Sequence, residues 1–406
     1  MYGHKKLAIA TAVVGALLGA SNANAAIETK IGDWNIQFSG NVNAFYTNAS
    51  CDDTDEVVAA GLACVGDDDD VNVRTGLLPS WFGFSATTTA NNFDVGVTLS
   101  FQPGVDSGQF VNGLDQALGL NTSNFRQVFL TIGNEAWGTI KFGRDLGIFA
   151  SDAILSDMTL LGVGSGAGGG GGNTTLGRIG TGYIYADWKG QISYTTPNFG
   201  GLSITAGIID PFGLSTLGAG AVSGTADVLN QSNDSPGFEA KAVYEWQGAW
   251  PGKVWVSGLV QEIDTAAGDY TANGFDIGAK VGFAGFEAVA YWYVGEGIGT
   301  TAYLFDAVSL TGEERDSDGG YVQLTYTVPG PNTKIGVSYG ISNLDRASGE
   351  PVSNLVEENR SWIVGVYHPL NDFVHLVLEY THTESEAHNG NEVEDDIISI
   401  GSILQF

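Results

Sequence analysis

The chain has 406 residues, of which 46 are acidic and 16 are Lys or Arg, so its formal net charge is −30. A surface this acidic repels nucleic acid and attracts cations, which excludes nucleic acid as a partner. The 59 glycines, the 11% aromatic content and the 10 prolines suit many strands and turns better than helices.

The amino terminus is typical of a secretory signal peptide. Basic MYGHKK is followed by apolar LAIATAVVGALLGA and by small residues that end in Ala23-Asn24-Ala25, an A-x-A cleavage site. The apolar stretch has about 14 residues, fewer than the roughly 20 of a spanning helix. We therefore predict a signal peptide over residues 1–25 and one exported domain over residues 26–406. Cleavage removes Lys5 and Lys6, which takes the net charge from −30 to −32.

No later segment offers an uncharged apolar run long enough to cross a membrane as a helix. A mature chain that sits in a membrane must therefore cross it as strands.

Both cysteines lie in one segment, CDDTDEVVAAGLAC, as Cys51 and Cys64. An exported chain with one close pair is expected to oxidise it, so we predict a disulfide across a loop. Closing a loop of this length adds roughly 3 kcal/mol in the chain-entropy model. The alternative, a metal site, lacks a second cluster of Cys or His beside the pair.

Strict alternation of apolar and polar residues begins with WNIQFSGNVNAFY, residues 34–46. The same period of two recurs in FDVGVTLSF, residues 93–101, and in FDIGAKVGF, residues 275–283. A strand of a transmembrane barrel needs this pattern, because lipid lies outside and water inside. A strand of a soluble sandwich also alternates, so no single strand decides between the two.

The connections between strands decide more. Sixteen strands are predicted near residues 34–48, 72–88, 93–101, 125–133, 137–144, 183–197, 201–209, 237–247, 252–262, 273–283, 285–295, 320–328, 332–342, 360–369, 372–384 and 396–406. Short connections alternate with long ones of about 10 to 40 residues. That regularity predicts an all-β fold, a 16-stranded antiparallel transmembrane barrel with short periplasmic turns and long extracellular loops. Aromatic residues near the strand ends fit interfacial girdles, although ordinary aromatic usage in β-rich chains is the alternative.

Several segments resemble the Gram-negative general porins, which are trimeric sixteen-stranded diffusion channels. RQVFLTIGNEAWGTIKFGRDLGIF, residues 126–149, is similar to the family's fourth and fifth strands, with Gly143-Arg144 leading into the third loop. GQISYTTPNFGGLSITAGI, residues 190–208, is similar to the strand-turn-strand after that loop. The terminal Phe406 resembles the signal read by the barrel-assembly machinery.

The resemblance implies a homotrimer in outer-membrane lipid and lipopolysaccharide that passes small ions and solutes without any cofactor. It also implies a third loop, near residues 145–182, that folds into the lumen and places acids opposite basic wall residues. The loop acids are Asp145, Asp152 and Asp157, and the nearest basic candidates are Arg144, Arg126, Lys141 and Lys189.

This sequence departs from the family pattern in two places. Trp81 stands where many members carry an Arg, and the third loop continues into GVGSGAGGGGGN. Alternation also groups Arg144 with outward-facing Ile140 and Phe142, so Arg144 must lie beyond the lipid or follow a bulge at Gly143.

Alternation alone adds five lumen candidates, namely Glu239, Lys241, Glu245, Asp276 and Lys280. A solvated charge on the polar face of any β-protein is the alternative for each. Sixteen strands make a barrel wide enough for an aqueous channel.

Acids gather in the long loops. They are Asp52, Asp53, Asp55, Glu56 and Asp67–Asp70 in the first, Glu313, Glu314, Asp316 and Asp318 in the sixth, and Glu384, Glu386, Glu392, Glu394, Asp395 and Asp396 around the last. We expect an electronegative vestibule and, since rim charges act over only about 8 Å at physiological salt, a moderate cation preference. The run Asp67–Asp70 lacks the spacing and Gly of an EF-hand, which favours a solvated acidic loop over a calcium site.

Signals for catalysis are weak. His382 lies near Ser385 and Glu384, but no nucleophile elbow or oxyanion segment accompanies them. We therefore predict a channel and no enzyme. Two alternatives stay open: a substrate-selective channel with a lumenal binding site, and a non-conducting surface adhesin or structural barrel.

Overall fold

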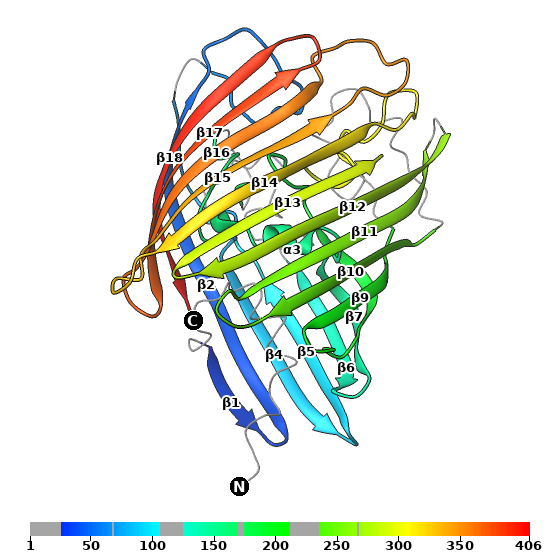
Figure 1. The fold of residues 1–406 in the computed structure, drawn as a ribbon, viewed down its shortest axis with the longest axis vertical. Coiled ribbons are helices and arrows are strands. Elements are labelled where there is room, and N and C mark those ends of the chain that lie inside the picture. Colours follow the sequence, from blue (N-terminus) through cyan, green and yellow to red (C-terminus); the bar gives the residue numbers. More distant parts are fainter. Residues whose placement is uncertain (1–25, 67–68, 106–124, 169–173, 212–234, 266–267) are drawn as a thin grey trace.

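The computed structural model describes residues 26–66, 69–105, 125–168, 174–211, 235–265 and 268–406. The predicted signal peptide, Asp67 and Asp68 of the acidic run, and most of the glycine run lie outside the described residues. What is described forms one barrel of tilted strands with a segment folded into it (Figure 1).

Every strand of the barrel pairs antiparallel with its neighbours. In the described part of the chain the strands are β1 (Ile27–Ile31), β2 (Trp34–Cys51), β3 (Asp70–Arg74), β4 (Trp81–Ala90), β5 (Phe93–Phe101), β6 (Gln127–Asn134), β7 (Gly138–Leu146), β8 (Trp188–Thr195), β9 (Leu202–Ile209), β10 (Gly237–Trp246), β11 (Gly252–Thr265), β12 (Gly268–Phe283), β13 (Phe286–Glu296), β14 (Asp316–Thr327), β15 (Lys334–Leu344), β16 (Val356–Pro369), β17 (Val374–Ala387) and β18 (Glu392–Gln405).

These eighteen segments occupy sixteen strand positions in a closed barrel, as predicted. β3 and β4 pair with successive parts of β2 and together occupy one strand position. β18 pairs with the upper part of β2, from Asp395↔Cys51 to Gln405↔Asn41, and closes the ring. β1 continues the line of β18 along the lower part of β2, from Ile27↔Phe38 to Ile31↔Trp34. Closure leaves no long strand edge unpaired, which a barrel in lipid requires.

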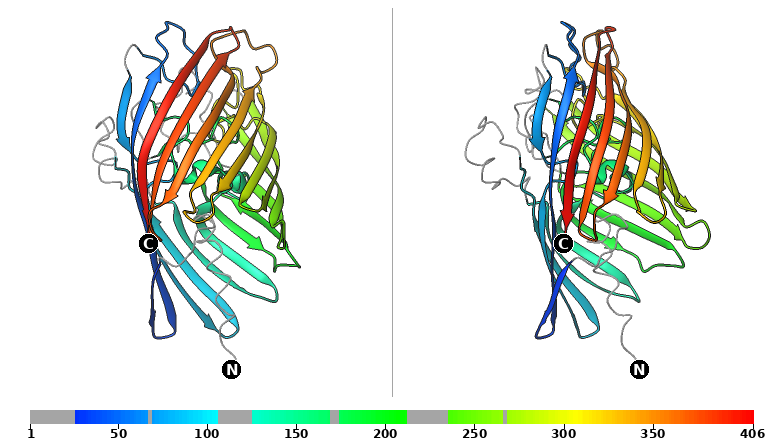
Figure 2. Two further views of the ribbon diagram at one scale, coloured as in Figure 1. Left: turned by 60° about the vertical axis from the view of Figure 1, so that its left-hand side comes forward. Right: turned by 90° about the vertical axis from the view of Figure 1, so that its left-hand side faces the viewer.

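Alternation sorts the side chains to two faces. On β18, Ile398 and Ile400 are 54% and 55% exposed, whereas Ile397 and Ser399, which alternate with them, are at most 1% exposed. The exposed residues form the outer, lipid-facing wall of the barrel seen in Figure 2. The inner residues are covered because loops fill much of the lumen.

Several predicted boundaries were wrong, each for a local reason. The strand predicted over 72–88 breaks at residues 75–80, because Leu77 leaves the wall and is buried against the third loop. The strand predicted over 183–197 begins only at Trp188, since 183–187 belong to that loop. β11, β12, β17 and β18 run beyond the predicted ends, and β1 was not predicted.

Helical structure is confined to the third loop in the described ranges. It consists of α3 (Ser151–Ile154) and the 3-10 turn η2 (Met158–Leu161). No helix in these ranges is long and apolar enough to cross a membrane.

The carboxyl terminus is built into the closing seam. The Gly40 N–H donates to the Phe406 carbonyl at 2.7 Å, and the Phe406 N–H donates to the Gly40 carbonyl at 2.9 Å. The Phe406 ring packs against Phe38 and Phe82 on the outer face, with ring centroids 5.5 and 6.1 Å away. A Cβ at Gly40 would lie 2.4 Å from the Trp81 carbonyl oxygen, so the seam has no room for a side chain there.

Gly40→Ala is therefore expected to destabilise the barrel by about 1–3 kcal/mol, the usual cost of overpacking. Urea titration of the refolded protein in detergent measures this. The matched control is Gly282→Ala, whose Cβ would find only contacts of 3.7 Å. Equal urea midpoints for the two variants would show that the seam tolerates a methyl group.

Candidate functional site

The described residues between β7 and β8, 147–168 and 174–187, lie inside the barrel and are called L3 here. In Figure 1, α3 of L3 lies behind the strands, within the ring. Its apolar residues, among them Phe149, Ile154 and Tyr183, pack against lumen-facing Trp255 and Tyr291 of the wall. A covered lumenal loop must satisfy its backbone polar groups without water, so the wall has to supply acceptors.

Glu239 on β10 binds the entry of L3. Its carboxylate accepts the Ile148 N–H at 2.5 Å and the Phe149 N–H at 3.1 Å. Its other oxygen pairs with Lys189 Nζ at 2.5 Å, and both side chains of this pair are almost fully buried. The buried charges therefore neutralise each other while they anchor the loop.

Asp276 on β12 binds the next residue. Its Oδ2 accepts the Ala150 N–H at 3.1 Å and the Tyr291 hydroxyl at 3.1 Å. Ala150 has a φ of +59°, a left-handed conformation that is unfavourable for alanine. The Ser257 hydroxyl also accepts from the Ala150 N–H, at 3.2 Å, so the wall stabilises this turn.

The middle of L3 is held by the opposite wall. Gln323 on β14 accepts the Met158 N–H at 2.7 Å. Glu379 on β17 accepts the Val163 and Gly164 N–H groups at 2.7 and 2.9 Å and the Tyr367 hydroxyl at 2.5 Å. L3 thus crosses the lumen from β10 to β17.

Asp157 and Arg178 connect the outgoing and returning halves of L3. Asp157 accepts the Thr159 N–H at 2.9 Å and, through its other oxygen, the Arg178 N–H at 3.2 Å and the Tyr183 hydroxyl at 2.8 Å. The Arg178 guanidinium is fully buried and donates to Ser338 at 2.5 Å and to Ser361 at 3.2 Å. Burial lowers the pKa of Arg178, and the nearby Asp157 raises it in opposition.

Asp152 in α3 faces two wall lysines. Its carboxylate binds Lys241 Nζ at 2.8 Å and Lys253 Nζ at 2.6 Å. Burial raises the pKa of Asp152, but the two lysines lower it by more, so this pKa lies well below its usual range. The stabilisation from these ion pairs is present above the unfolded pKa and is lost only as the pH falls through the lower folded value.

Asp145 meets Lys141 on the same face of β7, four residues apart, and also accepts Gln127 Nε2 at 3.1 Å. All three predicted loop acids are therefore engaged by wall or loop partners. Among the sequence candidates, Lys141, Lys189, Lys241, Glu239 and Asp276 share this network.

The remaining candidates lie apart from these acids. Arg126 stacks over the Trp188 ring at 5.8 Å. Arg144 pairs in register with Val128 and Gly190, without a register shift at Gly143, whose φ is +130°. The two arginines are among the charges that act on partly buried Tyr185 of L3.

Trp81 lies on the inner face of β4, and its ring occupies the space beside Gly83. Lys280 binds Glu287 at 2.8 Å. Glu245 is exposed near the short-turn end of β10.

Sequence reasoning missed Lys253, Arg178, Glu379 and Arg74. Lys253 could have been found, because it alternates inward with Trp255 and Ser257. Arg178 and Arg74 carry no such signal, since Arg178 lies in a loop and Arg74 reaches loop carbonyls, including Thr174 O at 2.8 Å, about a hundred residues away.

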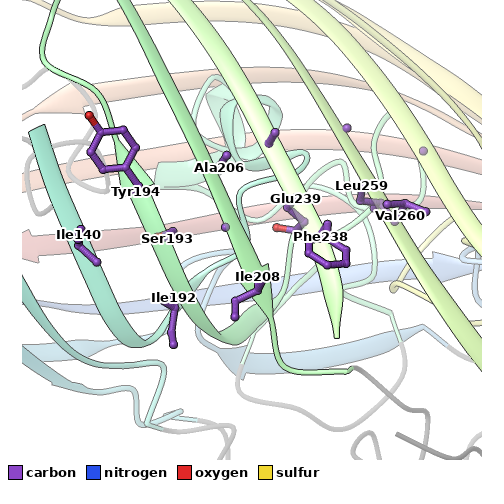
Figure 3. A pocket seen from close by; sticks show the side chains of 14 residues that line it. Ile140, Ile192, Ser193, Tyr194, Ala206, Ile208, Phe238, Glu239, Leu259 and Val260 are labelled. Carbon is purple, nitrogen blue, oxygen red and sulfur yellow. The ribbon is translucent and has the colours of Figure 1, made fainter. Parts of the chain in front are cut away.

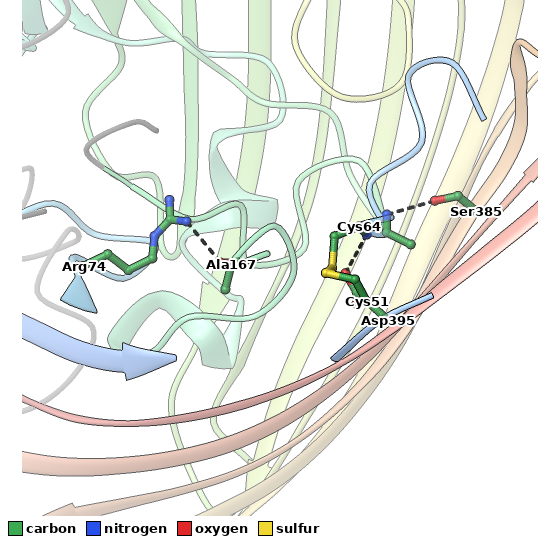
Figure 4. Close-up of a disulfide and its surroundings, with 7 residues drawn as sticks. Cys51, Cys64, Arg74, Ala167, Ser385 and Asp395 are labelled. Atoms are coloured by element: carbon green, nitrogen blue, oxygen red, sulfur yellow. Dashed lines mark hydrogen bonds between the residues drawn. A yellow bond between two sulfur atoms is a disulfide. The ribbon is translucent and has the colours of Figure 1, made fainter. Parts of the chain in front are cut away.

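The described part of the first loop, residues 52–66, also folds inward. Its Cys51–Cys64 disulfide is formed, as predicted. Figure 4 shows the Cys64 N–H beside Asp395, which accepts it at 3.0 Å, while Ser385 accepts the neighbouring N–H groups of the loop. Asn359 on β16 accepts the Leu62 N–H at 3.1 Å. The disulfide therefore closes a loop that lies on the inner wall of β16–β18.

The loop between β13 and β14, residues 297–315, covers the lumen from the other side. Tyr303 is buried there, with its ring 4.5 Å from Lys189 Nζ and its hydroxyl 3.3 Å from Gln261. The Thr301 carbonyl accepts the Tyr185 N–H of L3 at 2.9 Å. Three inward loops thus narrow the channel together.

The acids around the last loop divide between the two faces of the wall. Asp395 points inward, but Glu384, Glu386, Glu392, Glu394 and Asp396 share the outward parity of β17 and β18. On the same face Arg360 binds Glu358 at 2.6 Å and also pairs with Glu384. These five acids therefore line the outside of the barrel and not its mouth.

His382 does not form a catalytic group with Ser385. His382 lies on the outer face, where its Nδ1 is 3.0 Å from Asp396. Ser385 lies on the inner face and donates to Asn359 at 2.6 Å.

An apolar hollow of about 740 Å³ lies on the outer wall over β7–β12 (Figure 3). Exposed Tyr194, Ile208 and Phe238 surround small Ala206 and Ala240. Because these residues are on the lipid-facing side, the hollow is not part of the channel lumen.

A closed barrel of sixteen strand positions with an inward third loop defines a porin-type outer-membrane channel. A family model described as Gram-negative porin matches residues 10–388, so the chain belongs to the Gram-negative porin family. It is an outer-membrane channel and not an enzyme. No curated protein sequence matches the chain significantly.

Solved porin structures share the fold at low identity. The outer membrane channel DcaP of Acinetobacter baumannii has a TM-score of 0.67 and 16% identity, covering 94% of this chain and all of that one. An anion-selective porin from Comamonas acidovorans has a TM-score of 0.60 and 14% identity, covering 92% and 100%. A trimer form of OmpT of Vibrio cholerae has a TM-score of 0.55 and 13% identity, covering 92% and 99%. At these identities the likeness concerns the fold.

Proposed function

We propose that the chain forms a water-filled channel for passive diffusion of small hydrophilic solutes and ions, with a moderate preference for cations. The observation that carries this preference is the charge at the extracellular mouth. Asp53, Asp55 and Glu56 of the first loop and Glu313 of the sixth are exposed there. Asp316 and Asp318 were predicted to lie there as well, but they share the outward parity of Val322 on β14 and face away from the lumen. Deeper in the lumen, Asp145, Asp152 and Glu239 are each paired with lysine.

Reversal potentials across a salt gradient test the preference. Potassium is expected to permeate more readily than chloride at 0.1 M salt, and the difference is expected to shrink at 1 M, where the Debye length falls to about 3 Å. Equal or greater chloride permeability at 0.1 M would contradict the proposal.

A pair of charge-matched variants locates the effect. Asp53→Asn/Asp55→Asn removes two charges at the mouth and is expected to reduce the cation preference. Glu392→Gln/Glu394→Gln removes two charges from the outer face of β18 and is expected to leave the preference unchanged.

We also propose that the first 25 residues are removed on export, that three copies assemble, and that the barrel contacts lipopolysaccharide. The trimer form of OmpT, which shares the fold, supports the assembly. Phe406, seated in the seam, is proposed as the signal for the barrel-assembly machinery. Crosslinking in native membranes tests the trimer, and amino-terminal sequencing tests the cleavage site.

A further inference from the structure

Four lysines face the lumen between L3 and the short-turn ends of the strands. They are Lys241 on β10, Lys253 on β11, Lys280 on β12 and Lys334 on β15, and they are called the lysine row here. In a chain of net charge −30, four lysines on one part of the inner wall are a local reversal of sign.

The lysine row has fewer carboxylate partners than lysines. Asp152 is shared by Lys241 and Lys253. Glu287 binds Lys280 at 2.8 Å, and it is also the negative charge that acts most strongly on Lys334. Lys334 has no carboxylate within 4.0 Å among the described residues, and its ammonium lies 4.9 Å from the centre of the Tyr367 ring.

Repulsion between neighbouring lysines adds to this shortage of carboxylate partners. Lys253 and Lys280 are direct cross-strand partners on β11 and β12. Like charges in that position destabilise a sheet. Lys253 also lies 4.8 Å from the Trp255 ring, and such cation–π contacts hold an ammonium without neutralising it.

Other ionisable groups also face this part of the lumen. Glu245 is opposite Lys253 in register but is exposed, and His375 on β17 lies near Lys334. In direct ion pairs, two carboxylates, Asp152 and Glu287, serve the four lysines. Glu379 and Asp157 also act on Lys334, but without an ion pair, and both already accept N–H groups of L3. Between Lys280 and Lys334, β14 places Thr325 and Thr327 on the inner face, and their hydroxyl groups are hydrogen-bond donors.

We propose that the lysine row is a binding site for small oxyanions, namely carboxylates and phosphates, on the periplasmic side of L3. Ammonium groups held by rings and carboxylates retain N–H donors for charge-assisted hydrogen bonds to such anions. The site rests on the proposed channel function and adds retention of anions inside a channel whose mouth favours cations.

Inorganic phosphate is the probe. Single-channel currents are recorded in KCl with phosphate added to one side of the bilayer at a time. Phosphate on the periplasmic side is expected to interrupt the current at lower concentration than on the extracellular side, where the acidic mouth repels it. In Lys280→Gln/Lys334→Gln the phosphate concentration for half-block is expected to rise about tenfold or more.

The charge-matched control is Arg346→Gln/Arg360→Gln, which removes two positive charges outside the lumen. Phosphate is expected to block the current through this variant at the same concentration as in the native protein. Block that is equal from both sides, or that survives in Lys280→Gln/Lys334→Gln, overturns the site.

Phosphate binding to the detergent-solubilised protein, followed by ³¹P line broadening, separates the two proposals. A channel that conducts KCl but neither binds phosphate nor is blocked by it overturns the site and leaves the diffusion channel standing. If the protein does not conduct but broadens the ³¹P line of phosphate, and Lys280→Gln/Lys334→Gln abolishes the broadening, the site is supported and the diffusion channel is overturned. If the protein neither conducts nor binds phosphate, both proposals are overturned.

Discussion

Glu239→Ala is expected to lower the free energy of unfolding of the barrel by about 3–5 kcal/mol. The substitution leaves the Lys189 ammonium buried without its carboxylate and removes the acceptor of the Ile148 and Phe149 N–H groups. Urea unfolding of the protein in lipid vesicles, followed by tryptophan fluorescence, measures the loss.

Two further variants separate burial from pairing. Glu287→Ala breaks the ion pair between Glu287 and Lys280, whose side chains are 35% and 26% exposed. This variant is expected to lower the free energy of unfolding by only about 0–1 kcal/mol. Lys189→Met/Glu239→Leu removes both buried charges and is expected to recover the part of the stability that the unpaired Lys189 ammonium costs, but not the part lost with the acceptor of the Ile148 and Phe149 N–H groups. If Glu239→Ala and Glu287→Ala unfold at the same urea concentration, Glu239 is not the anchor described above.

Arg178→Met is expected to free the returning half of L3 and to destabilise the barrel by about 3–5 kcal/mol. The fully buried guanidinium joins L3 to Ser338 and Ser361 of the wall, and its removal takes away a positive charge that acts on Asp157. A loosened loop obstructs the lumen less, so the single-channel conductance is expected to rise and to become noisier. Conductance in a planar bilayer and urea unfolding measure the two effects.

Arg178→Lys is not expected to rescue either effect, because an ammonium cannot reproduce the planar fork of donors. The control is Arg346→Met on an exposed loop, which is expected to change stability by no more than about 0.5 kcal/mol. An unchanged conductance in Arg178→Met would show that L3 keeps its place without this contact.

The strands of this protein are predictable because lipid and water impose a period of two on nearly every one of them. β5 and β13 were recovered close to their observed limits, since their outward residues meet lipid along most of their length. Prediction failed at residues 75–80, where Leu77 meets L3 instead of lipid. There the environment of the side chain depends on a partner about a hundred residues away.

The site was predicted by residue type but not by pairing. Alternation and the family resemblance together selected Asp152 and Lys241, yet neither indicated that Asp152 is shared with Lys253. Alternation also cannot say which face is the outer one near a loop. Glu392 and Glu394 therefore looked like vestibule acids until their register with β17 placed them outside.

The sequence by itself determined the barrel, its sixteen strand positions and the disulfide between Cys51 and Cys64. It also predicts export. Those features follow from local patterns: a cleavage signal, alternation, the lengths of connections and a close cysteine pair. Only the tertiary structure decided how L3 crosses the lumen, because its path depends on Glu239, Asp276 and Glu379, three wall carboxylates on distant strands. A carboxylate becomes an anchor only when folding brings loop N–H groups to it and excludes water, and no local pattern encodes that meeting.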